Sequence, residues 1–372
     1  MRDDTLFKEW KALAKKVDIL AAARKHGRTL KRQGRAEWVG PCRACGGRDR
    51  FGVNTRKQWF NCRGFGGGDV IKMVMHLEGV DFNAACELLT GTPPPRGEST
   101  LDRAEIARRR ERLERESAER ATRQAREQAE DDERRRARAW EMYRCGVSAR
   151  GTVVTRYLEA RSIDPYSPAT RRLRFLPDTP FWYAGDDGQN RIIHSGPAMM
   201  SAIQGVDGRF LGIHLTWLAD DGSDKAEIFA PGTDKKLKVK KFRGLVKGGA
   251  IRLTGDVPGD VLLIGEGKET TWSVYDPLRR QRPDLSLAAW AAASLGNLGG
   301  GGKGPEPDMD NPGFLPPVWA KTILILGDGD SDPAKVREQT ERCRRRCAYL
   351  NHAAAVAMAE PDKDFNDMLR GM

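Results

Sequence analysis

The sequence has no apolar run long enough to span a bilayer, and its first ten residues, MRDDTLFKEW, are too charged for a signal peptide. It also lacks a P-loop, because in the glycine-rich run 296–304 Asn297 stands where the first glycine is required and Gly304 replaces Ser or Thr. We therefore expect a soluble, cytoplasmic protein with no membrane partner and no helicase motor, and a flexible loop at residues 296–304.

Cysteine is sparse, with seven residues in a chain of 372. The number is odd, and Cys42, Cys45 and Cys62 have the spacing of metal ligands, so the sequence does not indicate a disulfide framework. The length favours two or three domains.

Acidic residues are too few to balance the basic ones, since 52 Asp and Glu face 64 Lys and Arg and leave a net charge of +12. The first 96 residues contain 19 Lys and Arg against 10 Asp and Glu, and so hold most of the excess. A basic surface attracts phosphate polyanions, which makes nucleic acid the favoured partner. The alternative is that the charge only keeps the chain soluble.

Residues 1–33 alternate apolar and basic positions with a helical period. After them, Cys42 and Cys45 form a C-x2-C pair, Cys62 follows, and residues 50–53 and 58–61 have the pattern of a short hairpin. Thiolates supplied by two such loops make the tetrahedral site of a zinc ribbon. Arg50 and Trp59 are our candidates for nucleic-acid contact, through phosphate binding and base stacking respectively.

This segment resembles the N-terminal zinc-binding domain of DnaG-type primases, including Asp-Arg-Phe before the turn and Gly-Gly-Asp at the start of a helix. The resemblance places the last zinc ligand three residues after Cys62, where this chain has Phe65. The sequence leaves two readings open. In the first, a zinc site is completed by His26, His76, Cys86 or water. In the second, the domain packs around Phe65 and binds no metal.

The organisation predicted along the chain is a zinc-ribbon-like domain at residues 1–92, a charged helical linker at 93–139, a primase-type subdomain at 140–256 and a final domain at 257–372. The run GTPPPRGEST is a linker by composition, and the long charged segment after it is read as a spacer helix.

In the third region, Val206-Asp207-Gly208 joins two predicted strands in a hairpin. A basic run follows, from which we take Lys240, Lys241 and Arg243 as binding a nucleotide or a template strand.

Acidic residues follow two apolar strands in the final region. Glu266 comes after 261–264, and Asp328, Asp330 and Asp332 come after 322–326. In an open parallel α/β sheet, strands deliver such residues to one crevice, where hard oxygen ligands favour Mg²⁺. The competing reading is that these acids cap helices.

The Glu-Gly and Asp-x-Asp pairs resemble the Toprim domain of primases, topoisomerases and some nucleases, over roughly residues 257–369. The resemblance implies Mg²⁺ or Mn²⁺ bound by Glu266, Asp328, Asp330 and Asp332, with the first three catalytic. Lys268 is a candidate for phosphate contact. The ending Asp-Phe-Asn-Asp resembles that of phage and plasmid primases, with Asp364 and Asp367 near the metal.

The resemblance as a whole is to a DnaG-type primase of phage or plasmid kind. It implies a multidomain α+β and α/β protein that makes RNA primers on single-stranded DNA from nucleoside triphosphates, beside a separate replicative helicase. The alternatives are a Toprim nuclease, with water as the attacking group, and a non-catalytic DNA-binding accessory of replication.

Overall fold

The computed structural model describes residues 4–27, 29–33, 36–95, 100–185, 189–255 and 258–372. The chain divides into two compact units, Met1–Gln128 and Ala129–Met372. Together they contain the ribbon, the long helix and the mixed α/β region of the predicted fold class.

The first unit combines an antiparallel sheet, with strand order β1-β2-β3-β4-β5, and four short helices. Its strands are β1 Lys31–Arg32, β2 Glu37–Cys42, β3 Gly46–Asn54, β4 Trp59–Cys62 and β5 Gly66–Gly68. Its helices are α1 Asp4–Lys16, α2 Ile19–His26, α3 Val70–Glu78 and α4 Phe82–Thr90. Residues 1–33, predicted as helical, break at Asp18, whose carboxylate caps α2, and end in the edge strand β1.

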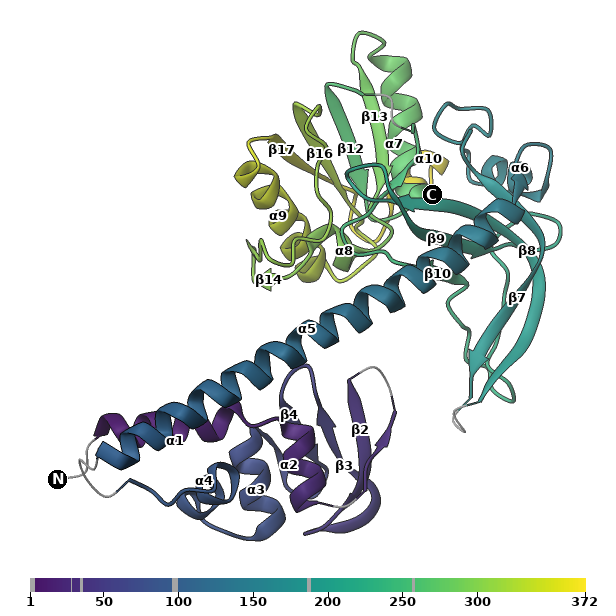
Figure 1. Ribbon diagram of the computed structural model, residues 1–372. Coiled ribbons are helices and arrows are strands. Elements are labelled where there is room, and N and C mark those ends of the chain that lie inside the picture. The colour runs from purple at the N-terminus through teal and green to yellow at the C-terminus, as the bar shows by residue number, and fades with distance from the viewer. Residues whose placement is uncertain (1–3, 28, 34–35, 96–99, 186–188, 256–257) are drawn as a thin grey trace. The chain divides into compact units, whose positions relative to one another are not determined.

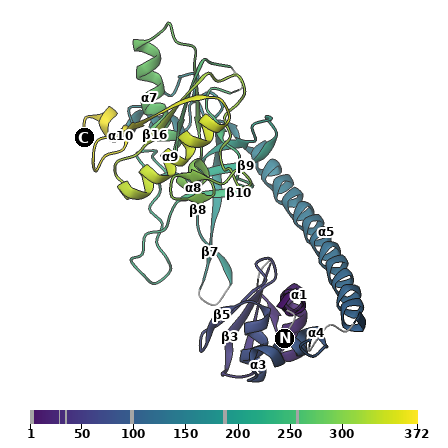
Figure 2. The same cartoon turned by 90° about the vertical axis from the view of Figure 1, so that its left-hand side faces the viewer.

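The charged segment forms α5, Thr100–Cys145, which Figures 1 and 2 draw as one uninterrupted helix. Ion pairs with a spacing of three or four residues, such as Arg110 with Glu114, run along its exposed surface. Leu113 packs with Leu6 and Leu13 of α1, while Ala139 joins the core of the second unit. Each end of the helix is therefore anchored by a few apolar side chains.

The second unit contains an antiparallel sheet with the order β10-β9-β8-β7-β6. Its strands are β6 Val147–Ser148, β7 Arg174–Ala184, β8 Asn190–Gln204, β9 Phe210–Trp217 and β10 Lys240–Gly244, and helix α6 Val153–Ala160 lies between β6 and β7. The predicted hairpin at Asp207 is confirmed, because β8 and β9 pair on either side of it.

The same unit contains a second sheet, with the order β11-β13-β12-β16-β17, in which every pair except β11 with β13 is parallel (Figure 1). Its strands are β11 Ile251–Arg252, β12 Val261–Gly265, β13 Leu287–Ala291, β16 Thr322–Gly327 and β17 Ala353–Met358. Its helices are α7 Lys268–Gln281, α9 Pro333–Tyr349 and the short α10 Phe365–Arg370. The predicted parallel sheet is confirmed.

Helices cover both faces of this sheet because its strands carry apolar side chains on both faces. Leu263 packs with Trp272 of α7, whereas Leu262 and Ile264 pack with Cys343 and Cys347 of α9. The run predicted as a flexible loop instead begins with the short helix α8, Leu295–Gly299, and continues into the hairpin of β14 Gly302–Lys303 and β15 Glu306–Pro307. The buried Arg346 donates to the carbonyls of Leu298, Gly299 and Phe314, and so fixes this loop.

Candidate functional site

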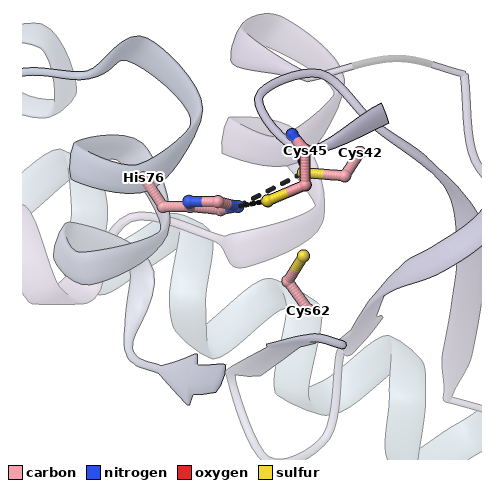
Figure 3. A group of neighbouring side chains, drawn as sticks. All are labelled: Cys42, Cys45, Cys62 and His76. Carbon is pink, nitrogen blue, oxygen red and sulfur yellow. Dashed lines mark hydrogen bonds between the residues drawn. The ribbon is translucent and has the colours of Figure 1, made fainter. Parts of the chain in front are cut away.

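Four side chains of the first unit gather into a cluster with the composition of a zinc site (Figure 3). Cys42, Cys45, Cys62 and His76 each offer one ligand atom, and these atoms all lie within 4.8 Å of one another. Cys42 ends β2, Cys45 lies in the following turn and Cys62 ends β4, as the ribbon pattern predicts. His76 comes from the opposite side, on α3, where Met73, His76 and Leu77 form the buried face.

The ligand atoms lie close enough together to share one metal ion, and the imidazole is in the form that binds metals. The Nε2 atom of His76 lies 3.2 Å from the Sγ atom of Cys42 and 3.6 Å from that of Cys45. Burial lowers the pKa of His76 and so favours the neutral imidazole that coordinates metals. Burial and the neighbouring thiols of Cys62 and Cys42 raise the pKa of Cys45 to about 11, so a cation is needed to hold these groups as thiolates. The donor set fits tetrahedral Zn²⁺.

Phe65 is not a ligand, but it contacts one. Its ring stacks on the imidazole of His76, with centroids 4.0 Å apart and planes 16° apart. Of the three fourth-ligand candidates from the sequence, His26 pairs with Glu78 instead, and Cys86 lies outside the cluster. The position that the ribbon pattern gives to a thiolate therefore carries an aromatic ring, which packs against the imidazole that completes the cluster.

A second group lies at the carboxyl edge of the parallel sheet. Glu266 follows β12 and is half-buried, and Asp328 follows β16, next to the exposed Asp330. Burial raises the pKa of Asp328 to about 7, the hydroxyl of Thr270 opposes the shift, and the carboxylates of Asp364, Asp330 and Glu266 add to it. Since these carboxylates repel one another across a partly dehydrated edge, a cation between them would stabilise all of them.

These acids are less tightly grouped than the thiolates. Within the part of the chain that the structure describes, the Cys and His cluster is the one set of three or more possible ligands whose atoms all lie within 4.8 Å. The oxygen donors nevertheless fit Mg²⁺, which takes one or two carboxylates and keeps several waters rather than filling a closed protein cage.

A family profile described as a CHC2 zinc finger matches residues 7–93. This segment is similar to CHC2 zinc fingers, and we refer to residues 7–93 as the finger. The resemblance of the ribbon to DnaG-type primases is thus confirmed, and the match together with the Cys42, Cys45, Cys62 and His76 cluster indicates zinc binding. A profile described as a domain of unknown function (DUF7146) matches residues 133–253. A comparison with curated proteins finds no match.

Several solved structures match this chain at low identity, and three of them are the following. The zinc-binding and RNA polymerase domains of the Aquifex aeolicus primase are 15% identical over 98% of this chain and 82% of that one, with a TM-score of 0.35. A DnaG primase catalytic domain bound to single-stranded DNA is 12% identical over 60% and 71%, with a TM-score of 0.35. The primase fragment of the bacteriophage T7 primase-helicase is 14% identical over 57% and 69%, with a TM-score of 0.32. At these scores the likenesses decide neither fold nor function.

The finger carries both predicted nucleic-acid contacts on one surface. Arg50 and Trp59 line a groove of about 330 Å³ together with Lys57 and Arg63, and half of the Trp59 side chain is exposed. An exposed indole beside cationic side chains is what base stacking and phosphate binding require.

The helix-cap reading holds for some of the acids of the second unit. Asp332 accepts hydrogen bonds from the backbone amides of Ala334 and Lys335 at the start of α9, and Asp364 and Asp367 form a capping box on α10. Asp328 caps no helix, and its carboxylate instead accepts hydrogen bonds from Thr270. The metal roles of Glu266, Asp328, Asp330 and Asp332 stay predictions.

The predicted phosphate-binding cations do not form one patch. Lys268 is buried, donates to the Ser201 hydroxyl at 3.2 Å, and has its pKa lowered to about 7 by burial. Lys240 pairs with Glu269 at 3.1 Å, whereas Lys241 lies over the ring of Phe181. Lys241 and Arg243 project from the opposite side of β10 to Lys240, because successive side chains of a strand alternate.

Sequence reasoning missed Glu269, the centre of a buried charge network. Its carboxylate accepts a hydrogen bond from the Tyr157 hydroxyl at 2.9 Å. Burial opposes its ionisation, but the ammonium groups of Lys240, Lys225 and Lys268 outweigh burial and hold its pKa well below the usual range. The sequence did contain a signal for this network. Polar residues directly follow Glu266 and Gly267, at the start of a helix that packs on a buried strand, where apolar side chains would be expected.

Replacing Glu269 with glutamine is expected to destabilise the second unit by about 3–5 kcal/mol, because three lysines lose the one carboxylate that they share. Urea unfolding at neutral pH measures the loss. Glu227→Gln, which removes the exposed partner of Lys236, is the matched control and should cost less than about 1 kcal/mol. Equal effects of the two substitutions would contradict the network.

Proposed function

We propose that this chain is a DNA primase that synthesises short RNA primers on single-stranded DNA by Mg²⁺-dependent nucleotidyl transfer, in phage or plasmid replication. The observation that carries the proposal is the partly buried Asp328, which faces three further carboxylates at the edge of a parallel sheet, in a chain that also has a CHC2 zinc finger. The finger favours a primase over a nuclease, because a nuclease needs the acids alone.

In this proposal the finger holds the template. Bases of single-stranded DNA stack on Trp59, and Arg50 binds the phosphates beside them. Stacking on an aromatic side chain contributes about 1–3 kcal/mol per base and tolerates any sequence. Zinc would fix the ribbon that carries the groove, because β2 and β4, which end in Cys42 and Cys62, flank β3.

The acidic edge is the proposed centre of synthesis, in a domain of the Toprim type. Asp328, Asp330 and Glu266 would hold Mg²⁺, which when bound activates the primer 3′-hydroxyl and neutralises charge on the leaving pyrophosphate. Lys240 pairs with Glu269 on the first turn of α7, and although burial lowers its pKa, the carboxylates of Glu269 and Glu266 raise it. It would bind the triphosphate, and Lys241 and Arg243 are assigned to the nucleic-acid backbone. A separate helicase is the proposed partner.

The test is ribonucleotide incorporation on single-stranded DNA with Mg²⁺. The wild type should make short template-dependent RNA, and Glu266→Gln and Asp328→Asn should each reduce the rate by a factor of roughly 100 or more, because each weakens binding of the cation that stabilises the transition state. Asp284→Asn, which changes an exposed acid paired with Arg282, is the control and should keep the wild-type rate. Metal-dependent cutting of the template without synthesis would identify a nuclease. DNA binding without either activity would identify a non-catalytic accessory protein of replication.

A further inference from the structure

The first turn of α7 consists of four buried polar residues, which directly follow Glu266 and Gly267. They are Lys268, Glu269, Thr270 and Thr271, each at most 5% exposed. Burying a polar side chain is costly unless it has a hydrogen-bond partner. Lys268 contacts β8 and Glu269 contacts α6 and β10, so the turn joins the two sheets of the unit.

Thr270 differs from the other hydroxyl residues of this helix. Thr271 and Ser273 each donate to the backbone carbonyl four residues earlier, Gly267 and Glu269 respectively, which is how buried hydroxyls in helices are usually satisfied. The Thr270 hydroxyl instead leaves its helix and donates to Asp328, at 3.0 Å from each carboxylate oxygen. Its partner thus belongs to a different strand and to the proposed metal edge.

We infer that Thr270 is a positioning residue, which fixes the carboxylate of Asp328 in the orientation that binds the divalent cation. The inference rests on the proposed function only in taking Asp328 as a ligand. Equal distances to both oxygens place the hydroxyl centrally between them, which restricts rotation of the carboxylate about its Cβ–Cγ bond. The remaining lone pairs are then directed away from α7.

The two contacts tie the carboxylate of Asp328, which follows β16, to the first turn of α7. Without Thr270, the carboxylate would lose this donor, and a cation would have to order it on binding.

The experiment measures Mn²⁺ binding directly, by electron paramagnetic resonance and calorimetry, in the full chain with its finger loaded with zinc. Thr270→Val keeps the size and branching of the side chain and removes the hydroxyl, so Mn²⁺ affinity should fall by about 10- to 100-fold, as is usual when the partner of a metal ligand is removed. Thr270→Ser restores the hydroxyl and should restore the affinity. Thr271→Val is the matched control on the same turn and should bind Mn²⁺ as the wild type does.

The outcomes separate this inference from the proposed function. Thermal unfolding must first show that Thr270→Val folds, and Thr270→Ala provides a second variant without the hydroxyl if it does not. Wild-type affinity in Thr270→Val, or no recovery in Thr270→Ser, would overturn the positioning role. If the wild type binds Mn²⁺ and Thr270→Val does not, but neither makes RNA, the positioning role stands and the primase proposal fails. If Asp328→Asn leaves wild-type affinity, Asp328 is not a ligand and both lose their support.

Discussion

Replacing His76 with alanine is expected to remove zinc from the finger. Structural zinc sites take four ligands, and their formation is worth about 10–16 kcal/mol at pH 7, so the loss of one ligand should cost about a quarter of this and weaken zinc binding by roughly 100-fold or more. Bound zinc per chain and a chelator competition titration measure the effect. His26→Ala, which changes a buried histidine paired with Glu78 outside the cluster, should keep the zinc.

Phe65 offers a stricter test of the same site. Because its ring already lies against His76, a thiolate introduced at this position is directed toward the cluster. The double variant His76→Ala with Phe65→Cys should therefore regain zinc, whereas His76→Ala with Phe65→Ala should not. Wild-type zinc affinity in His76→Ala alone would show that three thiolates and water suffice. Failure of the cysteine to restore binding would show that position 65 does not reach the metal.

The fourth ligand illustrates what the sequence could not decide. Cys42, Cys45 and Cys62 were recognisable because their spacing is local to a hairpin, and strands β3 and β4 lie where the pattern predicted them. His76 was one of three candidates, since its approach depends on how α3 rotates against the ribbon after β5. That rotation is set by the tertiary packing of Met73 and Leu77, which no local pattern contains.

The parallel sheet, in contrast, was predictable because its signal is local in the sequence. Its central strands β12 and β16 are apolar runs that each end in a glycine followed by an acid, so both their positions and the edge that bears Glu266 and Asp328 follow from the sequence. The direction of side chains on α7 did not follow, because this helix is covered by β12 and β13 on one side and contacts β8 and β10 through its first turn. Lys268 was therefore expected at a phosphate and lies instead against Ser201. The interface between the two sheets, not the period of the helix, determines its environment.

Asp328→Asn is expected to stabilise the metal-free protein at neutral pH, although it should abolish primer synthesis. The pKa of Asp328 rises from 3.8 to about 7 on folding. Below pH 4 the carboxyl is protonated in both states and the shift has no effect. Between pH 4 and 7 the unfolded chain releases the proton and the folded chain retains it, so stability falls as pH rises and levels off above pH 7. A shift of this size is worth about 4 kcal/mol.

The asparagine variant cannot ionise and should lack this fall. Urea unfolding with a divalent-metal chelator from pH 4 to pH 8 should give curves for the wild type and Asp328→Asn that diverge as pH rises, with the variant more stable at pH 8. Added Mg²⁺ should raise the stability of the wild type at pH 8 and leave the variant nearly unchanged, because binding to the folded state alone stabilises it. Asp284→Asn should follow the wild type in both experiments. Parallel curves for the wild type and Asp328→Asn would contradict the raised pKa of Asp328, which burial and the neighbouring carboxylates cause, and with it the reason for expecting a cation at this edge.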